Sequence, residues 1–391
     1  MASHRFIRST AELRDYLESI RDAKRIDFDT EFISDGKYKT QLCLVQAATE
    51  YGPVLIDPLA VDDMTLFWKI LCDPAVQVTA HSARSEMEFC YKAIGRVPDR
   101  LFDIQLAAGF VGIDYPASLK KLVDELLRID LPKDETRTDW RVRPLSILQV
   151  EYALNDVLFL ERMSGELRAR LERLGRIAWF EEESRDYLAR MVASFTGIGW
   201  QRVSGINSLG RRELAIVREL WYWREKKAAM KRRSANHILR DDVIIELAKL
   251  KITDPDRLAA LRSIHRRSDA AMYVQELPKI VARGLAIPDF ALPEIPVNFS
   301  FPNYPIAASW LLAVLHNEAK KRDLSPNILA VPQDARELVA RYAGTLPPEV
   351  TPRLMTGWRR EFLGSLPEEL LSGKRPVSFD LSRPDAPLRC D

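Results

Sequence analysis

Short apolar stretches separated by polar residues recur through the first 110 residues of the chain. Thr10–Ile20 and Asp63–Leu71 have the spacing of amphipathic helices. The pattern therefore predicts an α/β domain at the start of the chain. Four apolar stretches have the composition and length of buried strands: Arg25–Phe32, Gln41–Ala48, Val54–Asp57 and Val76–His81.

The pattern becomes helical from about Ser118 onward. Ser118 is a suitable N-cap for a helix with one apolar face. A longer helix is expected from about Ser146 to Leu174, with Gly175 as its end. Together with the strands, these helices complete a mixed α/β domain over roughly residues 1–200.

A second, helical unit is expected at residues 205–287. Asp241 and either Thr253 or Asp254 are its expected N-caps, and Pro255 suits a first helical position. The helices of this unit are predicted near three segments: Arg211–Met230, Asp241–Leu250 and Pro255–Ser263.

Five prolines fall between Pro288 and Pro305. They exclude a continuous helix and indicate an extended linker over residues 288–305. A third unit, residues 306–375, is again helical, and the proline-rich tail at 376–391 is expected to be irregular. The helices of this third unit are predicted near Ala307–Lys321, Asp334–Tyr342 and Thr351–Leu363.

The net charge of the chain is only +2, but the charge is unevenly distributed. Residues 201–267 contain 17 Lys or Arg and 8 Asp or Glu, a local net charge of +9 that leaves −7 for the remainder. An acidic body joined to a basic module favours a polyanionic partner, although a basic helical domain without a partner stays open.

Targeting and redox signals are weak in this sequence. No apolar run is long enough to cross a bilayer, and the first residues lack the apolar core of a signal peptide. Four scattered cysteines form neither a zinc pattern nor a dense disulfide framework. These features predict a cytoplasmic protein without a membrane partner, and no obligate protein partner is evident.

Two acids stand out inside the first long predicted strand. Asp29 and Glu31 occupy positions i and i+2, so their side chains project from the same face. Paired carboxylates in a buried strand need a compensating cation or hydrogen-bond network. A divalent metal site is the sharper interpretation, and two solvated acids at a strand end are the simpler alternative.

Further acids lie in suggestive places. Glu86 falls in the first turns of a helix that follows the fourth strand. Tyr152 and Asp156 are one helical turn apart and therefore share a face. A carboxylate can bind an ion while a neighbouring phenol orients or helps deprotonate water. Asp103 is expected to cap the helix that follows it.

Six segments carry a family resemblance when they are taken together and in order. They are Asp29–Phe32, Gln41–Gln46, His81–Glu88, Phe102–Gln105, Arg137–Leu145 and Glu151–Asp156. The chain resembles the ribonuclease D family, 3′-5′ exoribonucleases of the DEDD superfamily in the branch with a tyrosine in the last motif. Residues 205–285, and more weakly 306–373, resemble HRDC (helicase-and-RNase-D C-terminal) domains.

The resemblance implies an α/β RNase H-like exonuclease core, a mixed sheet flanked by helices, followed by two small all-α HRDC-like domains. It further implies that Asp29, Glu31 and Asp156 hold two divalent cations, Mg²⁺ or Mn²⁺, and that Tyr152 positions the attacking water. The family has aspartate where this chain has Glu86, whose extra methylene moves the carboxylate outward by about 1.5 Å.

We expect Glu86 to be the third metal-binding acid. Glu88 is two positions further along the same helix and should face elsewhere. A site damaged by the substitution, which would leave an RNA-binding protein with impaired catalysis, stays open as an alternative.

Several basic and polar residues are candidates for substrate contacts. His81 could instead satisfy local backbone groups, and Trp140 is expected to be a packing anchor. The Lys and Arg side chains of the segment 221–233 are about equally expected to bind the phosphate backbone of a nucleic acid or to face solvent without a ligand. The candidates are His81, Lys133, Arg137, Arg143, Arg224, Lys226, Lys227, Lys231, Arg232 and Arg233.

The family resemblance implies a substrate class. The expected partners are tRNA precursors and other small RNAs with extra 3′ nucleotides, and the expected products are nucleoside 5′-monophosphates. The HRDC-like units would hold the folded RNA while its single-stranded 3′ end enters the acidic site. A DNA 3′-5′ exonuclease stays open, because acids that bind metal do not distinguish the sugars.

Overall fold

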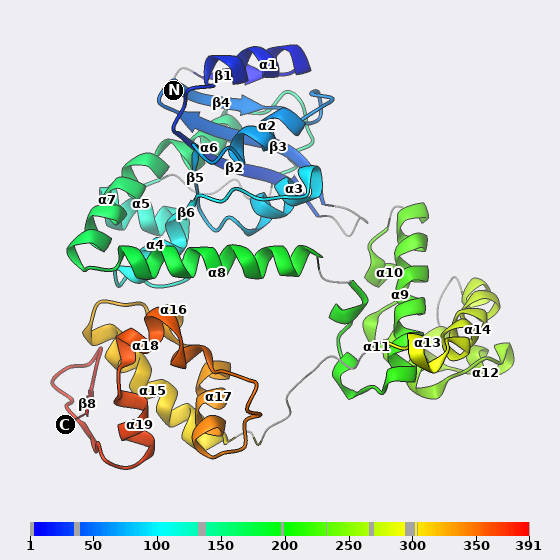
Figure 1. Ribbon diagram of the computed structural model, residues 1–391. Helices are drawn as coiled ribbons and strands as arrows, with labels where there is room; N and C mark the ends of the chain where they lie inside the picture. Colours follow the sequence, from blue (N-terminus) through cyan, green and yellow to red (C-terminus); the bar gives the residue numbers. More distant parts are fainter. Residues whose placement is uncertain are drawn as a thin grey trace. The chain divides into compact units, whose positions relative to one another are not determined.

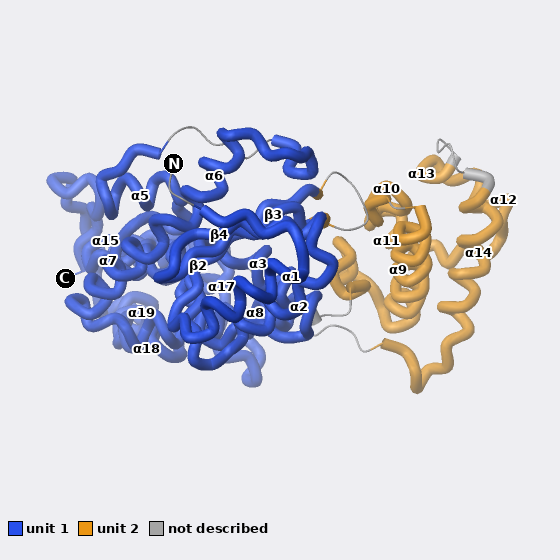
Figure 2. Tube along the Cα trace, turned by 90° about the horizontal axis from the view of Figure 1, so that it is seen from above, with its two compact units in different colours: residues 1–33, 42–195, 299–391 blue, residues 34–41, 196–298 orange. Residues whose placement is uncertain are grey.

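The computed structural model is an α/β domain joined to helical segments (Figure 1). It describes residues 4–34, 40–131, 138–196, 199–231, 233–265, 270–293, 302 and 304–390. Two compact units are present (Figure 2). The first comprises Met1–Ile33, Leu42–Phe195 and Phe299–Asp391, and the second comprises Ser34–Gln41 and Thr196–Asn298.

A six-stranded mixed sheet forms the centre of the α/β domain, in the order β1-β4-β3-β2-β5-β6. β2 pairs in parallel with β5, β5 with β6, and β1 with β4, whereas β3 and β4 are antiparallel. The four predicted strands are present, and the two that were not predicted, β1 and β6, have only three residues each. The strands are β1 (Arg5–Ile7), β2 (Arg25–Ile33), β3 (Gln41–Thr49), β4 (Gly52–Ile56), β5 (Gln77–Ala80) and β6 (Leu101–Asp103).

Helices pack on both faces of this sheet. Ile26 and Phe28 of β2 are buried in one core with α1, α2 and α3, whereas α6 packs against β2 and α7 against β5. Because side chains alternate along a strand, Asp29 and Glu31 project from the face opposite to Phe28. These helices are α1 (Thr10–Ser19), α2 (Thr65–Leu71), α3 (Arg84–Ile94), α6 (Ile147–Leu158) and α7 (Leu160–Arg173).

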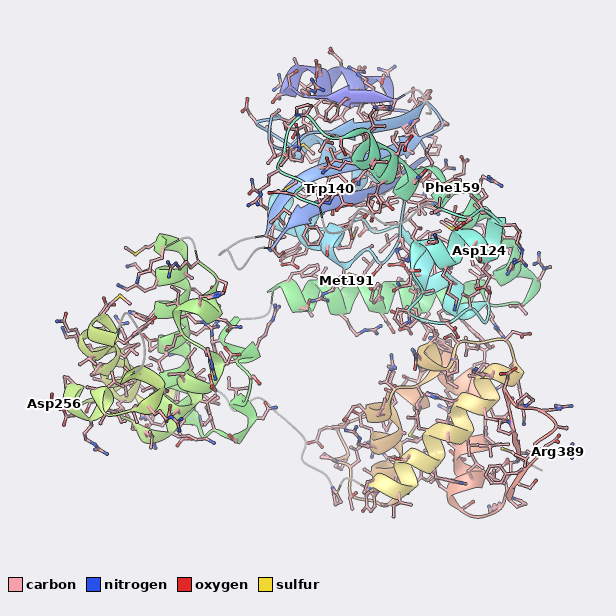
Figure 3. All side chains as sticks on the ribbon, turned by 180° about the vertical axis from the view of Figure 1, so that it is seen from behind. Asp124, Trp140, Phe159, Met191, Asp256 and Arg389 are labelled. Carbon is pink, nitrogen blue, oxygen red and sulfur yellow. The ribbon has the colours of Figure 1, made fainter. Side chains whose placement is uncertain are left out.

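The prediction of one long helix from Ser146 to Leu174 is wrong in one respect, because the structure has two consecutive helices there. Phe159, labelled in Figure 3, ends α6 and precedes α7. The start of α6 is fixed by a capping box in which Ser146 and Gln149 bond each other's backbone N–H groups. Three further helices are α4 (Ile104–Phe110), α5 (Leu119–Leu127), which Ser118 caps as predicted, and α8 (Ile177–Thr196), which was not predicted.

Between residues 199 and 293, the described residues of the second unit form helices and the loops that join them. Asp254 caps α12 by accepting a bond from the Asp256 N–H, as expected, but Asp241 is the first residue of α11 and not its N-cap. The Asp241 carboxylate instead accepts bonds from Arg224 and from the Ser204 N–H. The helices are α9 (Arg211–Lys231), α10 (Ala235–Ile238), α11 (Asp241–Leu250), α12 (Pro255–Ala259), α13 (Arg262–His265) and α14 (Ala270–Ala286).

The C-terminal helices share a hydrophobic core with the α/β domain. The rings of Phe110 and Trp358 lie 4.9 Å apart, and Arg359 forms a buried ion pair with Glu183 of α8. The domain boundaries given above stay predictions. These helices are α15 (Pro305–Lys321), α16 (Pro326–Leu329), α17 (Pro332–Tyr342), α18 (Gly357–Leu363) and α19 (Leu366–Leu371).

The expectation of an irregular tail is wrong. β7 (Val377–Phe379) and β8 (Leu388–Cys390) form an antiparallel pair. Asn317 of α15 anchors this hairpin, because its side-chain amide both donates to and accepts from the Leu388 backbone at 2.8 Å. In the part of the chain that the structure describes, no helix combines the length and apolar character needed to cross a bilayer.

Candidate active site

Three elements that are distant in the sequence bring the predicted acids together. β2 carries Asp29 and Glu31, and its neighbour β5 leads into α3, whose first turn carries Glu86. α6 packs against β2 and carries Tyr152 and Asp156 one helical turn apart. The sheet order and the packing of α6 therefore account for the convergence of these side chains.

Hydrogen bonds tie Glu86 to the acids of β2. The Thr30 hydroxyl donates to Glu86 Oε1 at 2.7 Å, and the Thr30 N–H donates to Asp29 Oδ1 at 2.9 Å. Asp29 and Glu86 also interact by a side-chain hydrogen bond, which requires a proton on one of the two carboxyls. Glu86 is 4% exposed, so its longer side chain is turned into the site and not into solvent. The sequence analysis did not identify Thr30 as a site residue. The only signal for it in the sequence is its position between Asp29 and Glu31.

The electrostatics of the site oppose full ionisation. Burial, followed by the charges of Asp156, Glu86 and Glu31, raises the pKa of Asp29 well above its usual value. Burial and the charges of Asp156 and Glu86 raise the pKa of Glu31 to about 8. Burial also raises the pKa of Glu86 to about 7. Neighbouring carboxylates therefore take up protons unless a cation compensates them.

This donor set fits a divalent cation. All four acids offer oxygen, which Mg²⁺ and related hard cations prefer. Within the described ranges, however, no group of three or more Asp, Glu, His or Cys side chains is placed to hold a metal ion. A cation at this place would relieve the repulsion among the charges of Asp29, Glu31, Glu86 and Asp156 that raises the pKa of Asp29 and of Glu31.

Tyr152 lies beside a buried tryptophan. The rings of Tyr152 and Trp140 are 5.9 Å apart, and Trp140 is 1% exposed. The expectation that Trp140 anchors packing is therefore confirmed. Tyr152 is half-buried on α6, one helical turn before Asp156, and Trp140 packs against its ring.

Two other polar residues organise the backbone around the site. Asp103 accepts bonds from the N–H groups of Gln105 and Leu106, which confirms that it caps α4. It also accepts a bond from the Ala83 N–H at 2.9 Å, immediately before α3. Asp103 thus fixes the start of the helix that carries Glu86. His81 Nε2 lies 2.9 Å from the Ala117 carbonyl oxygen, a contact that fits the structural alternative, and its substrate role stays a prediction.

Arg143 is engaged within the protein. Its guanidinium donates to both Asp57 carboxylate oxygens, at 2.6 and 2.8 Å, and to the carbonyl oxygens of Cys43 and Trp140. These contacts favour a structural role for Arg143 in joining the loop before α6 to β3 and β4. Lys133, Arg137 and Arg232 lie outside the described residues.

The described basic residues of the segment 221–233 fall into two groups. Arg224 is buried and donates to Asp241, and Lys227 forms an ion pair with Glu276 at 2.7 Å. By contrast, Lys226, Lys231 and Arg233 are exposed. Only the exposed group has the accessibility that phosphate binding needs.

Comparisons with known proteins agree with this architecture. A family model described as 3′-5′ exonuclease matches residues 4–172, and the HRDC domain model matches residues 213–281. The chain is 31% identical to ribonuclease D of Bartonella henselae, with 97% of this chain and 92% of the relative covered. It is 32% identical to ribonuclease D of Pseudomonas paraeruginosa, with 92% and 95% covered.

Solved structures show the same likeness. The crystal structure of Escherichia coli RNase D matches with a TM-score of 0.79 and 26% identity over 95% of this chain and 99% of that chain. The catalytic core of RRP6 from Trypanosoma brucei shares the fold, with a TM-score of 0.52 and 22% identity over 72% of this chain and 80% of that chain.

The mixed sheet, the acids gathered on β2, α3 and α6, and the exonuclease match define the class of this protein as a 3′-5′ exonuclease. It is thus a hydrolase of phosphodiester bonds. Within that class, the chain belongs to the ribonuclease D family, whose members are 3′-5′ exoribonucleases.

Proposed function

We propose that this exoribonuclease trims the 3′ ends of tRNA precursors and other small RNAs and releases nucleoside 5′-monophosphates. The observation that carries the proposal is that β2, α3 and α6 gather Asp29, Glu31, Glu86 and Asp156, with Glu86 held by the Thr30 hydroxyl at 2.7 Å. We further propose that these four acids hold two divalent ions, Mg²⁺ or Mn²⁺. When bound, such ions stabilise the attacking and leaving oxygens of a phosphodiester.

The side chains have separate roles in this proposal. The four carboxylates bind cations, and the Tyr152 phenol accepts or donates a hydrogen bond that orients the attacking water. Packing of Tyr152 against Trp140 supports this role, because it restricts the phenol to one region of the site. The position of the phenol one turn before Asp156 places both groups on the same face of α6.

Retention of activity with glutamate at position 86 is supported by the hydrogen bond from Thr30. This bond and the contact with Asp29 hold the Glu86 carboxyl at the acid pair. Glu88 forms an ion pair with Lys92 at 2.6 Å instead. We therefore favour Glu86 over Glu88, and a working nuclease over an RNA-binding protein with impaired catalysis.

RNA is the proposed substrate. E. coli RNase D is described as an exoribonuclease involved in structured RNA processing, which supports a structured RNA here. The exposed side chains of Lys226 and Lys231 on α9, and of Arg233 just after it, offer phosphate contacts in the HRDC region. We also propose a cytoplasmic location, which agrees with four cysteines that form no disulfide.

Digestion of a 3′-extended tRNA is the test. With Mg²⁺ the wild type is expected to shorten the extension stepwise to 5′-monophosphates, and with EDTA it is expected to leave the RNA intact. The Glu86→Ala variant should lose about 100-fold or more in rate, because losing an outer-shell group alone costs about 10–100-fold. Gel electrophoresis and chromatography of the products give both readouts.

Glu86→Asp is the matched control, because it restores the aspartate of the family pattern. It is expected to keep activity within about tenfold of wild type. Equal rates for wild type and Glu86→Ala would remove Glu86 from the site, and magnesium-dependent digestion of a matched DNA with no digestion of RNA would favour the DNA exonuclease.

A further inference from the structure

Two adjoining cavities form a groove at the amino ends of β2, β5 and β6. One has a volume of about 330 Å³ and the other about 470 Å³. Gln77, Arg100 and Arg168 line both cavities, so the two lie side by side. α7 and α8 complete the walls with Arg168 and Arg185, respectively. We call this the basic groove and define it by Lys24, Arg100, Arg168 and Arg185.

The bases of the basic groove are available to a ligand. Lys24, Arg100 and Arg185 are exposed, and among the described side chains no carboxylate forms an ion pair with any of the four defining bases. Arg168 lies 5.2 Å from the centre of the Phe102 ring and donates to Gln77 at 3.4 Å. These weak contacts leave its charge uncompensated.

Acids on the rim of the basic groove do not cancel this charge. Arg25 at the groove is paired with both Glu161 at 2.7 Å and Asp27 at 3.1 Å, so it adds no free positive charge and these acids are already engaged. Asp99 and Glu181 also line the smaller cavity. These two acids are fewer than the four defining bases, so the basic groove keeps a net positive charge.

The basic side chains of the groove are spread over both cavities. Lys24 borders only the larger cavity and Arg185 only the smaller one. One phosphate does not contact both ends. The Phe102 and Phe180 rings in the smaller cavity are only 2% and 4% exposed, so neither offers a surface for base stacking. Lys and Arg side chains that are spread along a groove without an exposed aromatic ring suit the phosphates of a nucleic-acid backbone. Double-stranded RNA is recognised mainly through its phosphates and 2′-hydroxyls.

The basic groove and the acidic site lie at different points of one strand. Arg25 begins β2 beside the groove, and Glu31 lies six residues further along. At about 3.3 Å per residue the separation is about 20 Å. An RNA that occupies both places must extend well beyond one nucleotide.

We propose that the basic groove binds the phosphate backbone of the folded part of the RNA while the 3′ end of that RNA is at the acids. The proposal rests on the proposed function, and it adds a second RNA-binding surface on the exonuclease domain. The surface recognises backbone charge and not base identity.

The test uses the full-length protein and a triple variant, Lys24→Ala, Arg100→Ala and Arg185→Ala. Binding of a fluorescent 3′-extended tRNA is measured by anisotropy in EDTA at several salt concentrations. We expect about tenfold weaker binding for the triple variant and a salt slope that is shallower by about 2, because each phosphate contact contributes about 0.7–0.9 to the slope.

A matched control removes three positive charges elsewhere on the same domain. The exposed bases Arg14, Lys69 and Arg128 are replaced with alanine, and this control is expected to bind like wild type. Thermal unfolding shows whether each variant is folded. With Mg²⁺, the triple variant should lose more rate on the tRNA than on a short unstructured RNA.

Two outcomes overturn the proposal. The first is an equal affinity and salt slope for the triple variant and wild type. The second is that wild type binds inorganic phosphate or adenosine 5′-monophosphate and the triple variant does not, while both bind the tRNA equally well. That result would make the groove a site for small anions. Failure of the wild type to shorten even the short RNA would instead contradict the proposed function, so the two failures are distinguishable.

Discussion

The Asp29→Asn variant is expected to lose about 100-fold or more of its magnesium-dependent activity on a 3′-extended RNA. Asparagine keeps the size and one oxygen of the side chain but removes its negative charge. Asp29 interacts with Glu31, Glu86 and Asp156, so the loss weakens the shared attraction for cations. Loss of a group that only supports a metal ligand already costs about 10–100-fold, and a ligand should cost more.

The same variant is expected to be more stable than wild type when no divalent metal is present. Burial and neighbouring charges raise the pKa of Glu31 to about 8. The folded state therefore holds a proton that the unfolded state loses near pH 4.5, and the free energy of unfolding falls as the pH rises from about 4.5 towards 8. Burial and the charges of Asp156, Glu86 and Glu31 also raise the pKa of Asp29, so the folded wild type must hold a proton there that the unfolded chain loses. Asparagine needs no such proton, so the advantage of the variant should grow over that interval.

Glu88→Gln is the matched control for both readouts. Glu88 also lies on α3 but pairs with Lys92. Its amide variant should keep the rate of wild type and show no gain in stability with rising pH. Thermal unfolding in EDTA between pH 5 and 8, together with RNA digestion, measures both effects, and an Asp29→Asn variant with wild-type activity would contradict the assigned site.

The Arg359→Met variant is expected to lower the free energy of unfolding by about 3–5 kcal/mol, the usual cost of breaking a buried ion pair from one side. Arg359 of α18 and Glu183 of α8 are 3% exposed each. Arg359 also donates to the carbonyl oxygens of Leu329 and Ile328. The substitution therefore leaves a buried carboxylate with fewer partners and two buried carbonyl groups without their donor.

The pH dependence of this contribution has a definite sign. Burial alone would raise the pKa of Glu183, but the hydrogen bond and charge of Arg359 lower it below its usual value. A depressed pKa stabilises the folded state above the ordinary carboxyl pKa, and the contribution is lost as the pH falls through the folded value. The difference between wild type and Arg359→Met should therefore shrink in acid.

The double variant Arg359→Met with Glu183→Gln is the control, because it removes the unpaired charge. It should recover part of the lost stability, although Glu183 also accepts bonds from Trp358 and Arg190. Denaturant unfolding at neutral pH measures all three proteins. A loss below about 1 kcal/mol for the single variant would mean that the pair is not desolvated as described.

The sequence predicted the parts of the fold that depend on local pattern. The apolar residues in 25–33 and 41–49 follow a pattern that is strong enough to predict strands. β1 and β6 have three residues each, too few for a periodic signal, and they are strands because neighbouring strands supply the pairing. The break at Phe159 was missed because helical spacing continues on both sides of it.

Contacts between distant segments were the other part that local pattern did not reveal. Nothing near Arg359 or Trp358 indicates that their partners lie on α8, since that packing depends on the tertiary fold. In the same way, Arg143 and Arg224 are ordinary bases in the sequence, and only the structure pairs them with Asp57 and Asp241.

Asp29 and Glu31 were found because their chemistry conflicts with their surroundings, whereas Glu86 and Asp156 were found from their helical positions and the family resemblance. Asp29 and Glu31 interrupt an apolar strand, which local pattern alone does not explain. Thr30, in contrast, is unremarkable in a strand, and its bond to Glu86 became visible only once α3 was placed beside β2. The basic groove escaped notice because its four bases are scattered from residue 24 to residue 185.

Diffraction from crystals grown with Mn²⁺, recorded for anomalous scattering, tests the central claim most directly. The account predicts paired manganese peaks held jointly by the carboxylates of Asp29, Glu31, Glu86 and Asp156. Ions bound elsewhere, or peaks that touch none of these four side chains, would contradict it.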